Sequence, residues 1–332
     1  MGSDPLPRKP YWLKAKLPAG STYQTVDRLL GSLQLNTVCS SARCPNLGDC
    51  WGRGTATFMI LGNVCTRHCG FCAVRTGNPG GKVDASEPDR IAAAVAQLAL
   101  HYVVITSVDR DDLPDLGAGQ FACTIEAIRR TGPNENRAQG VKEPRNQADP
   151  TRLPESPNPG VLSSVRIEVL IPDFNARPDL LSQVVSAAPT VLGHNLETVE
   201  ELTPEVRDPR ASYRTSLEVL RRAKELNPGQ MTKSGIMVGL GETRAQVIQT
   251  MRDLRASQVD IITIGQYLRP ARRNLPVREY VTPEQFAEYA RQGRELGFRA
   301  VFSAPLVRSS FHAAEVVSSS ASSEPRQLEP GA

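Results

Sequence analysis

Cysteine is the residue type in this chain whose spacing indicates chemistry. Six of the seven cysteines lie between positions 39 and 72. They form one group with the spacing C-x4-C-x5-C and one with the spacing C-x3-C-x2-C, namely Cys39, Cys44 and Cys50, then Cys65, Cys69 and Cys72. Thiolates are soft ligands that suit zinc and iron–sulfur clusters. Two groups of three therefore predict two metal centres.

The second group fits an iron–sulfur cluster with one open iron. A [4Fe–4S] cluster is normally held by four thiolates, so three cysteines leave one iron free to bind a substrate or a cofactor. An aromatic residue, Phe71, stands directly before Cys72. The first group also supplies three ligands and has no fourth nearby. Its fourth ligand is therefore expected from a distant part of the chain.

Other chemistries remain open from the spacing alone. Zinc prefers C-x2-C pairs within a set of four tetrahedral ligands, and Cys69 and Cys72 form such a pair, which His68 could join. A c-type haem needs a histidine where Ala73 stands, and the ferredoxin run C-x2-C-x2-C-x3-C-P does not occur. Disulfides are disfavoured, because seven cysteines is an odd number and no secretory signal is visible.

Composition points to a globular enzyme. The chain has 332 residues, of which 40% are hydrophobic and 22% are charged, enough for one large domain or two small ones. The net charge of +4 is scattered and aromatic residues make up only 5%, so no stacking platform for nucleic acid is expected. No apolar run reaches the roughly 18 residues of a membrane span. With reduced thiols, these features predict a cytoplasmic protein without nucleic-acid or membrane partners.

Strand and helix patterns alternate along residues 55–305. Apolar or β-rich runs predict strands at 57–61, 102–106, 165–171, 190–194, 232–240 and 260–265. Helical patterns follow them at 89–100, 119–130, 178–187, 211–226, 244–256 and 283–296. Six strand–helix units in this order predict an α/β fold, a partial (β/α)6 barrel of TIM type with a parallel sheet.

The carboxyl ends of the strands in such a barrel gather at one mouth. The second cysteine group follows the first predicted strand. Residues 107–112, 194–197 and 239–242 follow three later strands. These four loops are therefore expected to surround one site.

Three segments lie outside the alternation. Residues 1–54 form an N-terminal extension that carries the first cysteine group and a predicted helix at 23–33. Residues 131–160 are rich in Pro, Asn, Gly and charge, which predicts a disordered insertion. Residues 306–332 form a C-terminal extension whose serine-rich end after His312 is expected to be flexible. Within the barrel, Cys123 is expected to be a buried apolar residue of its helix.

These stretches together resemble the lipoyl synthases, radical S-adenosylmethionine (SAM) enzymes that insert sulfur into a protein-bound octanoyl chain. The resemblance covers nearly all of residues 10–313 except the insertion. It rests on 39–51, 57–74, 103–119 (VVITSVDRDDLPDLGAG), 194–199 (HNLETV), 233–242 (KSGIMVGLGE), 264–268 (IGQYL) and 308–313 (RSSFHA). It implies a sulfurtransferase that uses SAM and two [4Fe–4S] clusters.

The resemblance also implies the role of each cysteine group. Cys65, Cys69 and Cys72 match the ligands of the cluster that binds SAM. Cys39, Cys44 and Cys50 match three ligands of an auxiliary cluster, and Ser310 matches the serine that is its fourth ligand. A serine oxygen is a harder ligand than a thiolate, so it is easier to lose from iron. A labile iron suits a cluster that is consumed as the sulfur source.

For SAM itself the resemblance points to the strand-end and loop residues Thr106, Ser107, Asn195, Glu197 and Lys233. Thr106 and Ser107 are expected near the methionine amino group. Asn195 and Glu197 are expected near the ribose or the carboxylate, and Lys233 offers a positive charge to that carboxylate. Each of these residues also has an alternative interpretation as a capping or supporting residue.

The implied reaction places two sulfur atoms at C6 and C8 of octanoyl-lysine, where no acidic proton allows base chemistry. A carbon radical made from SAM breaks these C–H bonds, and the auxiliary cluster donates the sulfur. The implied partners are octanoylated lipoyl carrier domains (E2 subunits of dehydrogenase complexes and the glycine cleavage H protein), a reducing ferredoxin or flavodoxin, and an iron–sulfur carrier protein.

Three departures from the family pattern keep alternatives open. Phe311 replaces the tyrosine usual beside the serine ligand, and Ser40 and Ser41 stand where acidic residues are common. The third is the insertion at 131–160. None of them removes a ligand. They leave open a divergent radical SAM sulfurtransferase for another acyl substrate. A non-enzymatic iron–sulfur or zinc protein is the alternative from a different class.

Overall fold

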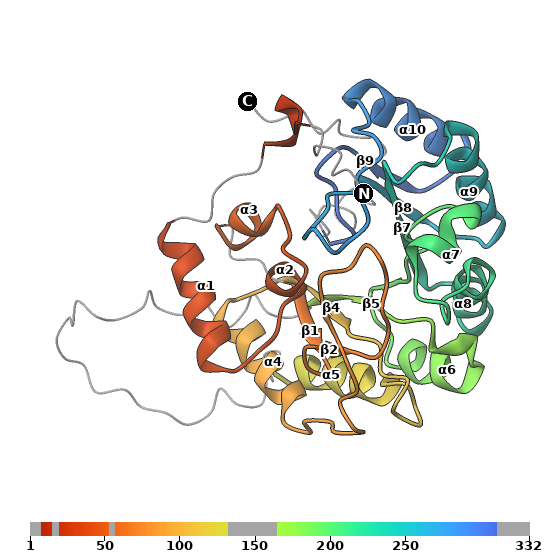
Figure 1. Ribbon diagram of the computed structural model, residues 1–332. Coiled ribbons are helices and arrows are strands. Elements are labelled where there is room, and N and C mark those ends of the chain that lie inside the picture. Colours follow the sequence, from red (N-terminus) through yellow and green to blue (C-terminus); the bar gives the residue numbers. More distant parts are fainter. Residues whose placement is uncertain (1–7, 15–19, 53–56, 132–164, 311–332) are drawn as a thin grey trace, which may run out of the picture.

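Seven parallel strands form the central sheet of the computed structural model, which describes residues 8–14, 20–52, 57–131 and 165–310 (Figure 1). The strands are β1 Thr57–Ile60, β4 Tyr102–Ser107, β5 Arg166–Leu170, β6 Val191–Gly193, β7 Met231–Val238, β8 Ile261–Gln266 and β9 Ala300–Ser303. Each strand pairs with the next in this order. Successive strands lie side by side when every strand–helix unit crosses over with the same hand. The predicted partial barrel is confirmed.

The sheet has one strand more than predicted. β9 pairs in parallel with β8, from Ile261 opposite Ala300 to Ile264 opposite Ser303. Its four residues, AVFS, are all only half-buried, and the apolar run within them is only three residues long. The sequence therefore predicted one strand too few. A second small sheet, of β2 Val64–Cys65 and β3 Arg75–Thr76, was also not predicted.

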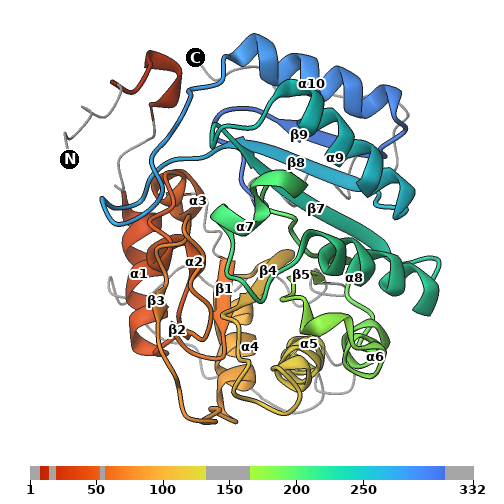
Figure 2. The same ribbon diagram turned by 45° about the vertical axis from the view of Figure 1, so that its right-hand side comes forward.

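Helices cover the outer face of the sheet (Figures 1 and 2). They are α4 Glu87–Gln97, α5 Ala118–Thr131, α6 Pro178–Ser186, α8 Tyr213–Leu226, α9 Arg244–Ala256 and α10 Pro283–Glu295, all close to the predicted ranges. The side chains of Ser212, Thr243 and Thr282 accept a backbone N–H at the start of α8, α9 and α10. Such caps satisfy N–H groups that have no partner inside the helix, and thereby set where each helix begins.

The prediction for Cys123 was wrong, because its side chain is exposed. The buried side of α5 is formed by Phe121, Ile125 and Ile128. Cys123 stands two residues after Phe121 and two before Ile125, about 200° around the helix from either. It therefore faces solvent.

Three helices of the N-terminal extension pack along the β1 edge of the sheet (Figure 2). They are α1 Ser21–Ser32, α2 Val38–Ser41 and α3 Leu47–Gly52, and a short 3-10 helix, η1 Tyr11–Leu13, precedes them. Val26, Cys39 and Trp51 belong to the same hydrophobic cluster as Phe58 of β1. Tyr23 stacks on Trp51 with a ring-centroid distance of 5.2 Å. The first cysteine group is thus attached to the barrel by a shared core.

Two predictions lie outside the described residues. These are the insertion at 131–160, of which only Thr131 is described, and the tail after His312; Phe311 is also outside. Among the helices of the described ranges, none is long and apolar enough to cross a membrane.

Candidate active site

The second cysteine group lies on the loop after β1, and three other loops hold it. Thr66 donates its backbone N–H to the carbonyl of Asp109, after β4, at 3.0 Å. Gly70 donates to the carbonyl of Val206, at the end of the short helix α7 Thr203–Val206, at 2.9 Å. Leu275, after β8, donates back to the carbonyl of Gly70 at 3.1 Å. The expected gathering of loops at this mouth is present, and the loop after β8 takes part in it.

The three thiols of this group share one buried environment. Burial raises the pKa of Cys65 and Cys69 to about 12 and that of Cys72 to about 11, and each thiol raises the pKa of a neighbour in the group. Binding to a metal removes the proton from such thiols. The backbone N–H groups of Arg67 and Asp208 point at the sulfurs of Cys65 and Cys69, both at 3.4 Å. Donors of this kind stabilise negative charge on sulfur.

This donor set fits a [4Fe–4S] cluster. Hydrogen bonds to cysteine sulfur are one of the ways in which proteins tune such clusters. Within the described ranges, no three Cys, His, Asp or Glu side chains are grouped to hold a single metal ion. A cluster does not need three ligands around one ion, because each of its cysteines binds a separate iron.

Arg67, between Cys65 and Cys69, is held in place by three carboxylates. It is only 5% exposed. Its guanidinium lies 2.9 Å from Asp111 Oδ1, 2.9 Å from Asp173 Oδ1 and 3.4 Å from Asp109 Oδ1. Burial raises the pKa of Asp109 to about 6. Burial acts in the same direction on Asp111 and Asp173, but hydrogen bonds from Arg67 outweigh it and hold their pKa below the usual range.

This network joins the cysteine loop to the carboxyl ends of β4 and β5. Asp109 and Asp111 follow β4, and Asp173 follows β5. Asp109 also reaches the sulfur of Cys65, with its Oδ2 at 3.7 Å. We did not predict Arg67 or Asp173 as site residues. The sequence offered two signals for these residues. One is an arginine inside the C-x3-C spacing, and the other is the presence of acidic residues after two successive strands.

Of the predicted SAM residues, Thr106 and Ser107 lie at the end of β4. The hydroxyl of Thr106 donates to the carbonyl of Leu170 at 3.0 Å. The hydroxyl oxygen of Ser107 is buried and has no hydrogen-bond partner among the described residues. A buried hydroxyl without a partner is costly. Ser107 is therefore the better placed of the two to bind a ligand at the mouth.

Asn195 and Glu197 follow β6 and connect the mouth to the C-terminal segment. The Asn195 side chain donates to Glu197 Oε1 at 3.1 Å and to Ser309 Oγ at 2.7 Å. Burial raises the pKa of Glu197, and the charge of Glu197 raises the pKa of Cys72. These two residues thus lie between the second cysteine group and the serine segment.

Lys233 does not join the other predicted residues. It is 3% exposed, and its Nζ forms an ion pair with Glu168 Oε1 at 2.8 Å. The hydroxyl of Tyr102 donates to the other oxygen of Glu168 at 2.6 Å. Lys233 and Tyr102 lie near the amino ends of β7 and β4, away from the mouth. A buried charge needs such a pair, so we assign Lys233 no contact with SAM.

The first cysteine group lies on and between α2 and α3. Burial raises the pKa of Cys39 and Cys44, and the two thiols are close enough for Cys44 to add to the rise at Cys39. Arg308 opposes the rise at Cys44 through its positive charge. The side chain of Asn46 donates to the carbonyl of Leu306 at 2.7 Å.

These contacts bring the C-terminal segment that contains Ser310 to the first cysteine group. Ser310 is half-buried and is the last described residue of that segment. A fourth ligand from far along the chain is therefore available to this group.

Gly265 in β8 supports that segment. A Cβ atom at this position would lie 2.1 Å from the backbone oxygen of Val307. We expect Gly265→Ala to displace the serine segment, at a cost of about 1–3 kcal/mol in unfolding free energy, and to lower iron loading of the first group. Denaturant unfolding and iron analysis would show both effects.

Gly31 in α1 is the matched control, because a Cβ there meets no atom within 4 Å. Gly31→Ala should leave iron loading unchanged. Equal behaviour of the two variants would contradict the role assigned to Gly265.

The loop at residues 267–282, between β8 and α10, contacts both cysteine groups. Arg43, next to Cys44, donates to the carbonyl of Pro270 at 3.4 Å. Asn274 donates to the carbonyl of Cys72 at 2.7 Å, and Arg273 donates to that of Ala73 at 3.2 Å. Figure 2 shows this loop reaching from β8 towards α2 and α3. Sequence patterns did not predict that it links the two groups.

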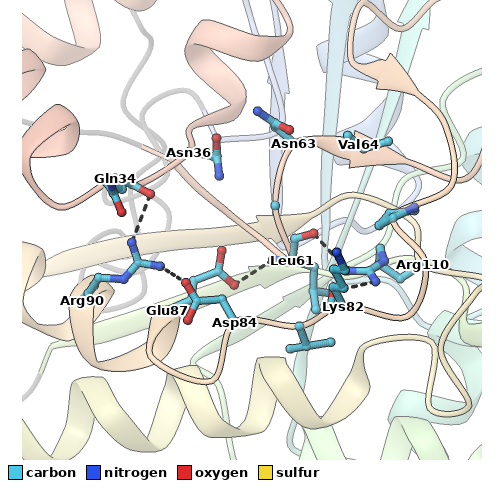
Figure 3. A pocket seen from close by; sticks show the side chains of 13 residues that line it. Gln34, Asn36, Leu61, Asn63, Val64, Lys82, Asp84, Glu87, Arg90 and Arg110 are labelled. Atoms are coloured by element: carbon cyan, nitrogen blue, oxygen red, sulfur yellow. Dashed lines mark hydrogen bonds and ion pairs between the residues drawn. The ribbon is translucent and has the colours of Figure 1, made fainter.

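A separate hollow of about 430 Å³ lies beside the turn after β1 (Figure 3). Its lining contains no cysteine. Most of its charged groups are already engaged: Arg110 Nε with Asp112 Oδ1 at 2.8 Å, Glu87 Oε2 with the backbone N–H of Leu61 at 2.8 Å, and Arg90 with Asp84. We therefore place the candidate active site at the barrel mouth and not in this hollow.

Comparison with protein families gives matches in two parts of the chain. Residues 59–254 match the radical SAM superfamily, and residues 2–44 match the N-terminal domain of lipoyl synthase of the radical SAM family.

Curated proteins called lipoyl synthase are similar over almost the whole chain. The protein from Thermus thermophilus is 50% identical, covering 93% of this chain and 86% of its own length. That from Rubrobacter xylanophilus is 51% identical, covering 92% and 86%. A mitochondrial lipoyl synthase from Nematostella vectensis is 48% identical, covering 92% and 94%.

Solved structures support the fold. HydG, a maturase of the [FeFe]-hydrogenase, has a TM-score of 0.51 at 13% identity and covers 78% of this chain and 54% of its own. Streptococcus suis SuiB bound to S-adenosylmethionine has a TM-score of 0.50 at 9% identity, covering 77% and 53%.

Proposed function

Because this chain belongs to the lipoyl synthase family of radical SAM enzymes, we propose that its two cysteine groups hold the two [4Fe–4S] clusters of that reaction. The chain is a sulfur-inserting enzyme whose cofactors are SAM and two clusters, one of them auxiliary. Cys65, Cys69 and Cys72 hold the cluster that binds SAM. The remaining ligands hold the auxiliary cluster: Cys39, Cys44, Cys50 and Ser310.

The observation that carries this assignment is that one loop touches the second group and also the residue next to Cys44 of the first group. The loop at 267–282 contacts Arg43 on one side and the backbone of Cys72 and Ala73 on the other. Sulfur insertion needs a radical source and a sulfur source that face the same substrate carbon. Groups held by one loop meet this need, because orientation of the reactants supplies a large part of the rate.

The cluster held by Cys65, Cys69 and Cys72 would supply the electron for the cleavage of SAM, and the auxiliary cluster would supply sulfur. The protein positions the reactants. Arg67 and its carboxylates fix the loop that carries Cys65 and Cys69, and two backbone N–H groups stabilise negative charge on these sulfurs. Ser107 offers an unpartnered hydroxyl to SAM. Asn195 and Glu197 orient the serine segment beside the mouth.

The substrate is a lipoyl-carrier protein. We propose that the carriers are octanoylated domains of dehydrogenase-complex E2 subunits and the glycine cleavage H protein. We propose ferredoxin or flavodoxin as the reductant, an iron–sulfur carrier protein as the source of clusters, and a cytoplasmic location, where thiols stay reduced.

We also propose that the chain divides as its sequence suggests. Residues 1–54 are an extension that carries auxiliary-cluster ligands. Residues 55–305 are the radical SAM barrel, and residues 306–332 carry the serine ligand. The support for the first and last assignments is the contact between Asn46 and Leu306, 260 residues apart.

Anaerobic reconstitution tests this function. We expect about eight irons per chain, four for each cluster. Incubation with SAM, dithionite and an octanoyl-lysine peptide should then yield a peptide with two added sulfur atoms by mass spectrometry. SAM cleavage without sulfur insertion would contradict the octanoyl substrate, and zinc in place of iron would contradict the assignment as a whole.

A further inference from the structure

The loop at 267–282 carries an unusual excess of positive charge. It contains four arginines and one carboxylate, Glu279. Arg272, Arg273 and Arg278 are exposed, as is Arg43, which contacts the loop through Pro270. We call Arg43, Arg272, Arg273 and Arg278 the rim arginines.

The rim arginines border the mouth on more than one side. Arg43 is adjacent to Cys44 in sequence, and Arg273 reaches the carbonyl of Ala73, next to Cys72. Arg278 donates its backbone N–H to the carbonyl of Gly239, after β7, at 2.9 Å. A macromolecule that delivers a side chain to this mouth must therefore pass close to these guanidinium groups.

Their charges are not neutralised by the part of the chain that the structure describes. The side chains of Arg43 and Arg273 bond to backbone carbonyls, and no rim arginine pairs with a carboxylate of the described residues. On the outer helices, by contrast, Arg221 pairs with Glu218, and Arg244 and Arg291 both pair with Glu288. Unpaired charges around a concave site focus a positive potential outward, and this potential attracts an acidic partner.

The loop that presents them is held rigidly. The hydroxyl of Tyr267 donates to the carbonyl of Leu275 at 2.8 Å. The side chain of Gln266 accepts from the N–H of Val281 at 2.8 Å and donates to the carbonyl of Glu279 at 2.9 Å. A surface that is already ordered loses less entropy when a partner binds.

We propose that the rim arginines are the docking surface for an acidic face of the lipoyl-carrier protein, around its acylated lysine. This inference rests on the proposed function, which makes a protein the bearer of the substrate. Charges at the rim of an interface act mainly on the rate of encounter and on its salt dependence. The rim arginines thus select carriers by charge, while the mouth recognises the acyl chain.

The test compares two substrates for the same enzyme, an octanoylated carrier domain and a short neutral octanoyl-lysine peptide. The test variant is Arg272→Gln with Arg278→Gln. The control variant is Arg252→Gln with Arg294→Gln, which removes the same charge from exposed positions on α9 and α10. Thermal unfolding of each reconstituted variant checks that the fold is retained.

We expect the test variant to lose about tenfold in kcat/KM for the carrier domain, mainly through KM, and to keep kcat/KM for the peptide within about twofold. The control variant should match the wild type on both substrates. The loss should shrink as ionic strength rises from about 0.01 M to about 0.15 M, because the Debye length falls from roughly 30 Å to roughly 8 Å.

Equal losses on both substrates would overturn the proposal, because the arginines would then act at the reacting centre. No loss on either substrate would overturn the proposal as well. Competition of duplex DNA with the carrier at about 0.15 M ionic strength would also overturn it, because the rim arginines would then form a nucleic-acid surface. Failure of the wild-type enzyme on the peptide would instead contradict the proposed function itself.

Discussion

Cys69→Ala is expected to abolish both SAM cleavage and sulfur insertion, whereas Cys44→Ala is expected to abolish sulfur insertion alone. Each group supplies only three thiolates, so the loss of one leaves too few to hold a cluster. In the proposed assignment, Cys69 belongs to the group that binds SAM, and Cys44 belongs to the auxiliary group. Each variant should fall from about eight irons per chain to about four, and the product of each lost activity should no longer be detected.

Two measured products distinguish the loss of SAM cleavage from the loss of sulfur insertion. Release of 5′-deoxyadenosine reports SAM cleavage, and the mass of the octanoyl-lysine peptide reports sulfur insertion. Cys123→Ala is the control, because Cys123 is exposed on α5, and it should keep both activities and all iron. Loss of SAM cleavage in Cys44→Ala, or its retention in Cys69→Ala, would show that the two groups do not have separate roles.

Arg67→Met is expected to destabilise the apo protein by about 3–5 kcal/mol, because it leaves buried carboxylates without their cation. Asp109, Asp111 and Asp173 all contact the guanidinium. The Arg67→Met variant should also lose the iron of the second cysteine group, since these contacts tie the cysteine loop to β4 and β5. The unfolding free energy of Arg67→Lys should lie between those of the wild type and of Arg67→Met, because lysine keeps the positive charge but lacks the planar fork of donors of arginine.

The destabilisation should depend on pH. In the wild type, hydrogen bonds from Arg67 outweigh burial and depress the pKa of Asp111 and Asp173. These two groups therefore stabilise the fold above their unfolded pKa, and this contribution is lost as pH falls. Without Arg67, burial raises their pKa, and the fold is then penalised increasingly as pH rises above the unfolded value near 3.9. The gap between variant and wild type should narrow from pH 7 towards pH 4.

Urea unfolding of the reduced apo proteins under anaerobic conditions measures this gap. Arg221→Met is the control. Arg221 pairs with Glu218 on α8, away from the cysteine loop, and its side chain is 45% exposed, so its loss should cost no more than about 1 kcal/mol. A similar cost for both variants would show that the Arg67 network does not hold the loop.

Local sequence was enough to predict most of the barrel and to propose the cluster ligands. Cys65, Cys69 and Cys72 lie within eight residues, so their spacing alone indicates that one loop presents them together. Strands and helices carry their own periodicity, which is why six strands and six outer helices were predicted. β9 was not predicted, because its residues are only half-buried and its pairing depends on β8.

Contacts between distant residues were decided by packing. Lys233 lies in a matching motif, yet the barrel interior pairs it with Glu168, 65 residues away. Arg67 meets Asp173 across 106 residues, and Asn46 meets Leu306 across 260. No local pattern encodes such pairs, because their partners are far apart in the sequence and meet only when the whole barrel has formed. The spacing of the cysteines therefore predicts which residues bind iron, and the closing of the barrel determines which distant side chains surround them.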